Sequence, residues 1–140
     1  MKIKIKKLNE NAKIPYYQIA GDAGLDLTAT SKKYNITTDS YIYGTGLSIE
    51  IPRGYVGYLF SRSSIYKRSL YLSNSVGVID SNFRNEIKVI FKRISFKEHG
   101  YEIGDRIAQL IIMPIPHIEF VESDTLSDTE RSGGFGSTGK

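Results

Sequence analysis

The sequence predicts an all-β protein, a jelly-roll-like barrel or sandwich of many short strands followed by a C-terminal arm. Apolar residues alternate with polar ones in several short windows, which is the pattern of half-buried strands. Gly, Pro and Asn residues separate these windows at close intervals. No window keeps apolar residues at helical spacing for three turns, so little helix is expected. Periodicity alone leaves a jelly roll and an immunoglobulin-like sandwich both open.

The individual strands follow from local pattern. Residues 3–6 and 47–51 alternate apolar with polar side chains, and the second run stops at a Pro-Arg-Gly turn. Residues 55–60 are rich in aromatic and β-branched side chains. Residues 76–79 and 86–92 suggest a hairpin with Asp80 and Phe83 at its tip. The other expected strands are 25–29, 41–43, 107–113 and 118–121, and residues 63–69 suggest a short helical segment.

Composition narrows the class of protein. The chain has 140 residues, 40% of them apolar, which suits one domain with its core in residues 1–122. It has no cysteine and two histidines, so thiolate sites are excluded and histidine chemistry is poorly supplied. A net charge of +4 with scattered basic residues predicts no direct nucleic-acid binding. The charged, alternating N-terminus does not resemble a signal peptide, and no apolar run suits a membrane span, so an intracellular protein is expected: cytoplasmic, or nuclear or in a host's cytoplasm if eukaryotic or viral.

The last part of the chain, residues 123–140, differs from the rest. It is acidic and polar as far as Glu130 and mostly Gly and Ser from Arg131 onward. Such a segment buries too little apolar surface to repay its ordering entropy, so a mobile arm is expected. Phe135, a single aromatic among small residues, suggests that the arm has a docking role.

Four segments carry polar groups suited to phosphate chemistry, although each also has an ordinary structural explanation. Asp26 lies between two leucines, so its carboxylate points away from the face that they share. Segment 61–64 offers one guanidinium and three hydroxyls after an apolar strand. Asp80 ends an apolar strand, where it either caps a turn or performs chemistry. Gln109 lies in the most apolar strand, where its amide needs hydrogen-bond partners.

Together with the Gly-rich tail, these segments resemble, in order and spacing, the five motifs of the trimeric dUTP pyrophosphatase family. The matching stretches are 23–27, 61–64, 74–87, 104–111 and 131–139, so the resemblance covers nearly the whole chain. It implies a β jelly roll, a homotrimer with active sites shared between chains, and an arm that closes over a neighbour's site. The implied activity is hydrolysis of dUTP to dUMP and pyrophosphate, which limits uracil in DNA and supplies dUMP.

The resemblance also implies residue roles. Asp80 would deprotonate a water that attacks the α-phosphorus, and a carboxylate is also the base most readily available in this composition. Mg²⁺ carried by the triphosphate is the expected cofactor, with Asp26 contacting it through water. Phosphate contacts are implied for Arg62, Ser63, Ser64, Gln109, Arg131, Ser137 and Thr138. Nucleoside contacts are implied for Asn74, Gly77, Val78, Ile79, Phe83, Lys88, Phe135 and Gly136.

Four departures from the family pattern are visible, among them Ser61 in place of a common Pro or Gly and Asn85 in place of a common glycine. Phe83 occupies a position where tyrosine is usual, and the arm is one residue shorter between Arg131 and Phe135. Three alternatives to a dUTP pyrophosphatase remain. One is a dCTP deaminase of the same fold, which needs a different set of groups around the base; Asn74 and the run 77–80 favour uracil. The others are a catalytically idle nucleotide-binding regulatory module and a structural viral-type jelly roll.

Overall fold

The computed structural model describes residues 1–130 and 133 of the chain, and in these residues it is all-β apart from one short 3₁₀-helix. The elements in chain order are β1 Lys4–Lys7, β2 Leu25–Thr28, β3 Ser31–Asn35, β4 Ser40–Gly44, β5 Leu47–Glu50, β6 Tyr55–Ser61, η1 Ser63–Lys67, β7 Leu70–Leu72, β8 Gly77–Ile79, β9 Lys88–Arg93 and β10 Arg106–Pro114. The predicted fold class is therefore confirmed, and most expected strands are present with ends that differ by one or two residues.

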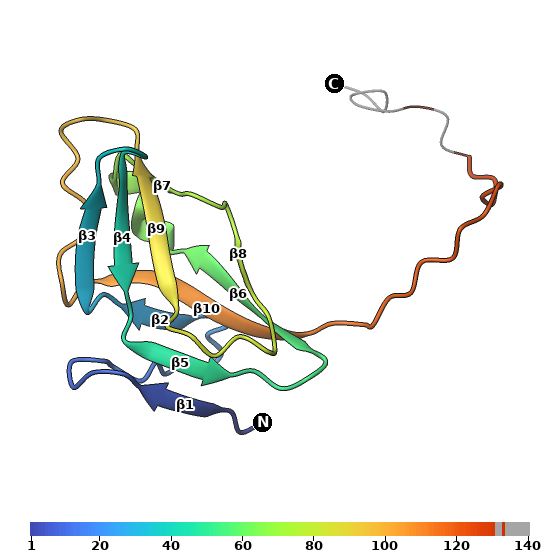
Figure 1. The fold of residues 1–140 in the computed structure, drawn as a ribbon, viewed down its shortest axis with the longest axis horizontal. Coiled ribbons are helices and arrows are strands. Elements are labelled where there is room, and N and C mark those ends of the chain that lie inside the picture. Colours follow the sequence, from blue (N-terminus) through green and yellow to red (C-terminus); the bar gives the residue numbers. More distant parts are fainter. Residues whose placement is uncertain (131–132, 134–140) are drawn as a thin grey trace.

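The strands form antiparallel sheets that stack against one another (Figure 1). One four-stranded sheet has the order β2-β10-β6-β8, and a second has the order β3-β4-β9-β7. A two-stranded ribbon of β1 and β5 completes the described part of the fold. The long pairing of β6 with β10 runs through seven residue pairs, from Ala108↔Ser61 to Pro114↔Tyr55, and forms the centre of the first sheet.

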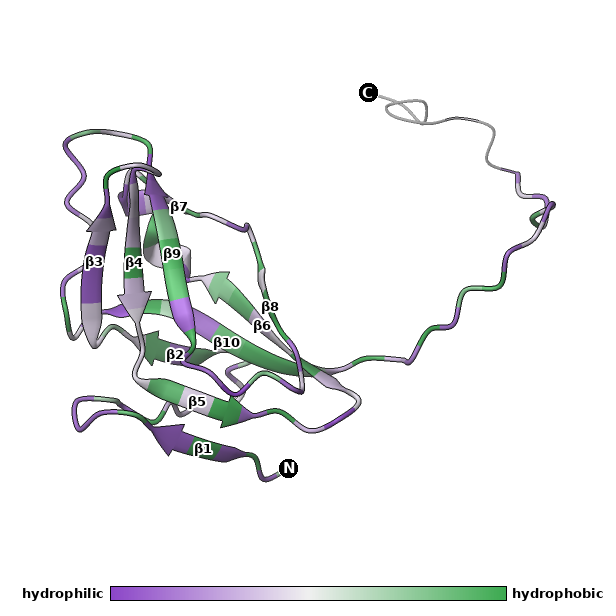
Figure 2. Cartoon of the chain, viewed as in Figure 1, coloured by the Kyte–Doolittle hydropathy of each residue, from purple (hydrophilic) through white to green (hydrophobic). Residues whose placement is uncertain are grey.

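The core lies between the two larger sheets. Leu27, Tyr43, Val89, Phe91 and Ile107 are fully buried and come from both sheets. Figure 2 shows the corresponding pattern, with β5 mostly hydrophobic and β3, on an outer edge, mostly hydrophilic. The alternation in the sequence therefore determines which face of each sheet packs against the core, because successive side chains on a strand point to opposite sides.

Two expectations about local structure are wrong. Residues 76–79 and 86–92 do not form a hairpin, because β8 pairs with β6 while β9 pairs with β4 and β7, in the other sheet. The segment between them therefore crosses from one sheet to the other. Residues 118–121 form no strand: the chain leaves the sheets after β10 (Figure 1), and a strand needs a pairing partner whatever its alternation.

Two strands were not foreseen. β3 is hydrophilic, with two lysines among its five residues, because it lies on an edge of its sheet. β7 has three residues, too few for an alternation to be recognised, and it is held by pairing with β9 from Leu70↔Arg93 to Leu72↔Phe91. Among residues 1–130 and Gly133, no helix has the length and apolar character needed to cross a membrane.

Two buried tyrosines allow a matched test of how much a hydrogen-bonded hydroxyl group in the core contributes to stability. The Tyr43 hydroxyl donates to the carbonyl oxygen of Tyr101 at 3.2 Å and accepts from its N–H at 2.8 Å. The hydroxyl of Tyr101 is itself buried without a hydrogen-bond partner in the described part of the chain. Tyr43→Phe should therefore lower stability by about 1–3 kcal/mol, because it strands two buried backbone groups. Tyr101→Phe should leave the melting temperature unchanged or raise it, as checked by thermal unfolding of both variants; equal losses would contradict this account.

Candidate active site

A pocket of about 300 Å³ opens beside β8 and the start of β9. Its lining residues are Leu59, Asn74, Gly77, Val78, Ile79, Asp80, Phe83, Glu86, Ile87 and Lys88. The pocket brings together Asp80 and every nucleoside contact expected from residues 74–88. A volume at the lower end of the range for ligand sites suits one small planar group.

Tight turns place the polar groups at this pocket. Ser75 has a φ of 59°, and the N–H of Ser75 donates to the carbonyl of Leu72 at 3.0 Å, so the chain reverses at Asn74. After β8, the N–H of Phe83 donates to the carbonyl of Asp80 at 3.1 Å. Arg84 braces this second turn by donating to the carbonyls of Ser81 and Phe83, at 2.7 and 2.8 Å. Asp80 is therefore held at the rim by backbone geometry.

Sequence reasoning missed three residues of this pocket: Leu59, Glu86 and Ile87. Glu86 accepts a hydrogen bond from the Gly46 N–H at 2.8 Å, and its other oxygen lies 3.9 Å from the Lys88 ammonium. These residues belong to the crossing between the two sheets or to the facing strand. Their position depends on the strand pairing, so no local sequence signal could have found them.

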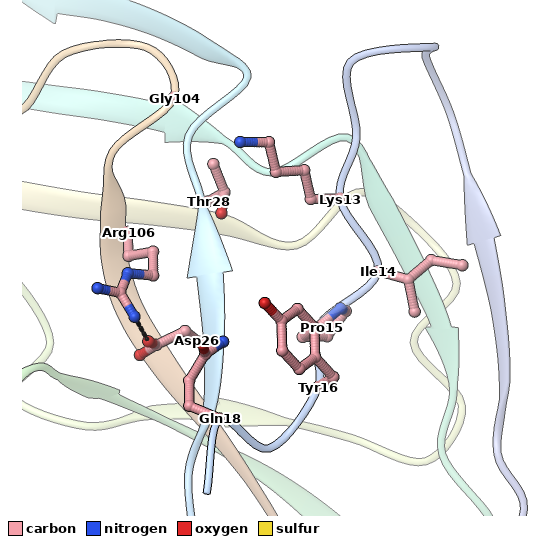
Figure 3. A pocket seen from close by; sticks show the side chains of 9 residues that line it. All are labelled: Lys13, Ile14, Pro15, Tyr16, Gln18, Asp26, Thr28, Gly104 and Arg106. Atoms are coloured by element: carbon pink, nitrogen blue, oxygen red, sulfur yellow. Dashed lines mark hydrogen bonds and ion pairs between the residues drawn. The ribbon is translucent and has the colours of Figure 1, made fainter.

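A second cluster of polar side chains surrounds Asp26 on β2. Its Oδ1 accepts from Arg62 Nε at 2.8 Å, and its Oδ2 accepts from Arg106 Nη1 at 3.0 Å (the latter drawn in Figure 3). The Asp26 side chain is only 16% exposed, and it faces a pocket of about 320 Å³ whose far wall is residues 13–18. Asp26 is therefore not a solvated carboxylate, because the register of β10 and the end of β6 bring two guanidinium groups onto it.

Gln109 belongs to the same cluster. It is directly opposite Asp26 across the β2–β10 pair, and its Nε2 donates to the carbonyl of Ser61 at 3.0 Å. The amide thus finds the hydrogen-bond partner that its half-buried position requires. A methyl group on Gly24 would overlap the Gln109 amide oxygen, so the glycine leaves the space in which this side chain lies.

This contact gives a prediction for Gly24→Ala. The added methyl group should displace the Gln109 side chain. For the dUTP hydrolysis and the phosphate contact that the sequence resemblance implies, kcat/KM should then fall by roughly tenfold to a hundredfold, the loss expected for one hydrogen bond to a charged group. Steady-state kinetics of Gly24→Ala, Gln109→Ala and the double variant would check it. The two effects should not add, because Gly24→Ala has nothing further to displace once the amide is gone; full additivity would contradict the prediction.

The two clusters lie far apart within one chain. Ile79 is opposite Gly57, which puts Asp80 level with Val56 at the start of β6, whereas Arg62 follows the last residue of that strand. Six residues of extended strand separate them by roughly 20 Å. The two clusters also lie on opposite faces of the sheet. Leu59 and Gly77, which are paired, line the first pocket. Gln109 is paired with Phe60, the next residue of β6, so these two side chains point to the other face.

Among residues 1–130 and Gly133, no three His, Asp or Glu side chains converge on one point, so the protein side offers no metal cage. Each Asp26 oxygen accepts one guanidinium hydrogen bond and keeps a further lone pair. That arrangement fits a hydrated Mg²⁺ contacted through water, since Mg²⁺ retains several waters in nucleotide sites.

The remaining expected site residues are Arg131, Phe135, Gly136, Ser137 and Thr138, and all five lie outside the described residues. Ser63 and Ser64 are at the start of η1, directly after Arg62. Ser64 lines a third cavity together with Arg62.

A β-sandwich with a carboxylate at the rim of a small pocket, and with a separate cluster of arginine and serine side chains, has the features of a nucleotide-binding enzyme. Residues 10–139 match the dUTPase family. The deoxyuridine 5′-triphosphate nucleotidohydrolases of Hydrogenobaculum sp. and Nautilia profundicola are 43% and 44% identical to this chain, over 99% and 100% of both proteins. The chain therefore belongs to the dUTPase family, and it is a dUTP diphosphatase, as its motifs predicted.

Solved structures agree with this assignment. A dUTPase of Staphylococcus bacteriophage 80alpha, determined with dUpNHpp, superposes with a TM-score of 0.84 at 27% identity and covers 99% of each chain. The dUTPase of S. aureus phage phi11, described with a structural Mg(II) ion, superposes with a TM-score of 0.76 at 25% identity over 89% of this chain and 98% of its own. The likeness to these structures confirms the expected jelly-roll-like architecture over the immunoglobulin-like alternative.

Proposed function

We propose that this dUTPase cleaves the bond between the α- and β-phosphates of dUTP, with Asp80 as the general base for an attacking water. The observation that carries the proposal is the position of Asp80 at the rim of a pocket that also contains Asn74, Gly77 and Phe83. A nucleoside bound in that pocket presents its α-phosphate toward the rim. A positioned carboxylate there contributes a factor of roughly 10²–10⁴ to the rate by removing the proton of the water.

Selection of uracil is proposed to rest on the same pocket. The Asn74 side chain and the backbone of Gly77 to Ile79, together with Lys88, supply donors and acceptors at its wall. Thymine adds a methyl group and cytosine replaces a carbonyl with an amino group, so a fitted wall rejects them by clash and by unpaired polar groups. Phe83 is 36% exposed and provides a ring surface against which deoxyribose packs. It needs no hydroxyl group for this.

The triphosphate is proposed to bind at the second cluster. Arg62, Ser63 and Ser64 supply a guanidinium and two hydroxyls, and the Gln109 amide lies beside them. Phosphate transfer depends mainly on positioning and on neutralising charge at the leaving group, which these side chains provide. Mg²⁺ is proposed to bind together with the triphosphate and would neutralise further phosphate charge. Asp26 would orient a water molecule bound to the Mg²⁺ ion.

A complete site is proposed to form only between copies of the chain, in a homotrimer. Asp80 and Arg62 are roughly 20 Å apart along β6, and the three phosphates of one nucleotide are consecutive groups that span far less. The face of β6 that carries the second cluster also carries Tyr58 and Phe60, whose ring centroids lie 6.1 Å apart. Half-exposed apolar side chains on such a face suit contact with a second copy.

The C-terminal region is proposed to complete the site of another copy. Ile118, Phe120 and Val121 are 63%, 93% and 84% exposed in the single chain, which a solvated segment does not need. We propose a core of residues 1–122 and an arm of residues 123–140, with Arg131 and the hydroxyls of Ser137 and Thr138 on phosphate. Phe135, next to Gly136, would stack on the base. The substrate is an intracellular nucleotide, so we also propose that the protein is cytoplasmic.

A nucleotide panel tests this function. Pyrophosphate release should be rapid with dUTP, and slower by orders of magnitude with dCTP, dTTP and UTP, when each is assayed with Mg²⁺ and with EDTA. Chelation should strongly reduce turnover of dUTP. Tight binding of dUTP without turnover would instead indicate an idle regulatory module, and release of ammonia from dCTP would indicate a deaminase.

A further inference from the structure

The segment that carries Asp80 belongs to neither of the two larger sheets. β8 ends at Ile79 in the first sheet and β9 begins at Lys88 in the second, so residues 80–87 form the crossing between them. Asp80 is at the start of this crossing and Phe83 is further along it, and both line the pocket beside β8. Strand pairing therefore does not fix the position of the proposed base, and other contacts must do so.

Arg84 holds the turn that follows Asp80. Its Nη1 donates to the carbonyls of Ser81 and Phe83, at 2.7 and 2.8 Å, so one guanidinium nitrogen spans the turn. In the part of the chain that the structure describes, Arg84 forms no ion pair. No carboxylate there draws the guanidinium away from these carbonyls, and its hydrogen-bonding capacity is directed to the turn.

The charges on the other side of Arg84 favour the same conformation. Arg84 lines a cavity of about 460 Å³ together with residues of β1 and β5. Lys4 and Lys6 are part of that wall, and the carboxylate of Glu50 in the same wall pairs with Lys4 at 3.6 Å. Like charges repel, so the two lysines disfavour rotation of the Arg84 side chain toward β1.

Ser48 on β5 anchors the backbone of Arg84. The Ser48 residue is only 8% exposed, and its hydroxyl donates to the carbonyl of Arg84. Three residues further along the crossing, the N–H of Ile87 donates to the carbonyl of Leu47 at 2.9 Å. Two neighbouring residues of β5 therefore hold the crossing at two points. A path of hydrogen bonds runs from β5 through Arg84 to the turn at Asp80.

We infer that Arg84 is a positioning residue for Asp80 and that Ser48 supports it. Neither residue lines the pocket beside β8, so both act on the reaction by fixing the place of the carboxylate. The inference rests on the proposed role of Asp80 as general base. Displacement of a catalytic group by about 1 Å costs up to roughly a hundredfold in rate. The nucleoside would keep its contacts with β8 and with Asn74, so binding should change less than turnover.

A double-variant cycle tests the inference. Arg84→Met removes the donors and keeps an unbranched side chain, whereas Arg84→Lys keeps a cationic donor. Arg84→Met should lower kcat for dUTP by roughly tenfold to a hundredfold and raise the Kd for dUMP by no more than about threefold, and Arg84→Lys should lose less. In the Asp80→Asn background, Arg84→Met should change the residual turnover by no more than about twofold, because the group that it positions is already disabled.

Ser48→Ala has a matched control in Ser40→Ala. Both serines are buried, but the Ser40 hydroxyl bonds that of Thr38 at 2.7 Å, at the start of β4. Ser48→Ala should lower kcat, and amide hydrogen exchange of residues 80–87 should be faster in Ser48→Ala and in Arg84→Met than in the unaltered protein. Ser40→Ala should lower the melting temperature and leave both kcat and this exchange unchanged.

The outcomes separate this inference from the proposed function. Losses of kcat that add fully in Arg84→Met with Asp80→Asn would refute the inference alone, and so would unchanged exchange of residues 80–87 in Arg84→Met. Faster exchange without any loss of kcat would also refute it. Arg84 is exposed, so its variants should melt as the unaltered protein does; a fall in kcat that follows a fall in melting temperature would mark Arg84 as merely structural. Full activity of Asp80→Asn would refute the proposed base and, with it, the inference.

Discussion

Asp80→Asn should abolish nearly all turnover of dUTP while the nucleotide still binds. The amide keeps the size and most hydrogen bonds of the carboxylate, but it cannot accept a proton from water at neutral pH. Loss of a general base costs a factor of roughly 10²–10⁴ in kcat. The turn from Asp80 to Phe83 is held by the Phe83 N–H bonding to a backbone carbonyl, so the pocket should retain its shape. The measurements are kcat by pyrophosphate release and Kd for dUTP by titration.

Asp39→Asn is the matched control for this variant. Asp39 pairs with Arg93 at 2.6 Å and accepts a hydrogen bond from the Tyr34 hydroxyl, on the sheet that contains β3 and β4. Those hydrogen bonds hold the pKa of Asp39 below its usual value, so the same substitution there should lower stability and leave kcat unchanged. An equal kcat in Asp80→Asn and in the unaltered protein would contradict the proposed role of Asp80 as general base. Loss of nucleotide binding in step with kcat would show that Asp80 positions substrate instead.

Mixing two inactive variants should restore activity if the sites are shared between chains. Asp80→Asn and Arg62→Ala damage the two clusters that lie at opposite ends of β6. In a randomly mixed trimer whose sites each take Asp80 from one chain and Arg62 from another, about a quarter of the sites contain both intact residues. The variants should be unfolded together at equal concentration, refolded and assayed beside each variant refolded alone. Recovery to about a quarter of the normal rate is expected from that count.

A site contained within one chain gives the opposite result, because every chain in the mixture carries one defect. No recovery after mixing would therefore contradict the shared site, provided that size-exclusion chromatography shows mixed oligomers. A mixture of Asp80→Asn with Asp80→Ala serves as the control. It contains no intact Asp80 and should stay inactive in either arrangement.

The sequence predicted the sheets better than it predicted their connections. Strands at residues 47–51 and 107–113 were expected because alternation and apolar runs are local properties, and the structure has them as β5 and β10. The hairpin expected around Asp80 failed because local pattern does not say which sheet a strand joins. β8 and β9 are neighbours in sequence but belong to different sheets.

The candidate site was likewise predicted only in part from the sequence. The order of the motifs indicated Asp80, Asn74 and Gly77, and the structure gathers them in one pocket. The pairing of Asp26 with Arg62 and Arg106 was not foreseen, since three segments distant in sequence meet only through the register of β10 with β2 and β6.

The placement of the two clusters at opposite ends and faces of β6 has a consequence for symmetry. In the proposed trimer, each copy would present one kind of surface to the neighbour ahead and a different kind to the neighbour behind, so the contact would be head-to-tail. Contacts of that type either close into a ring or continue as an open filament. A substitution that altered the rotation between neighbours without weakening their contact would therefore produce fibres that still contain intact sites.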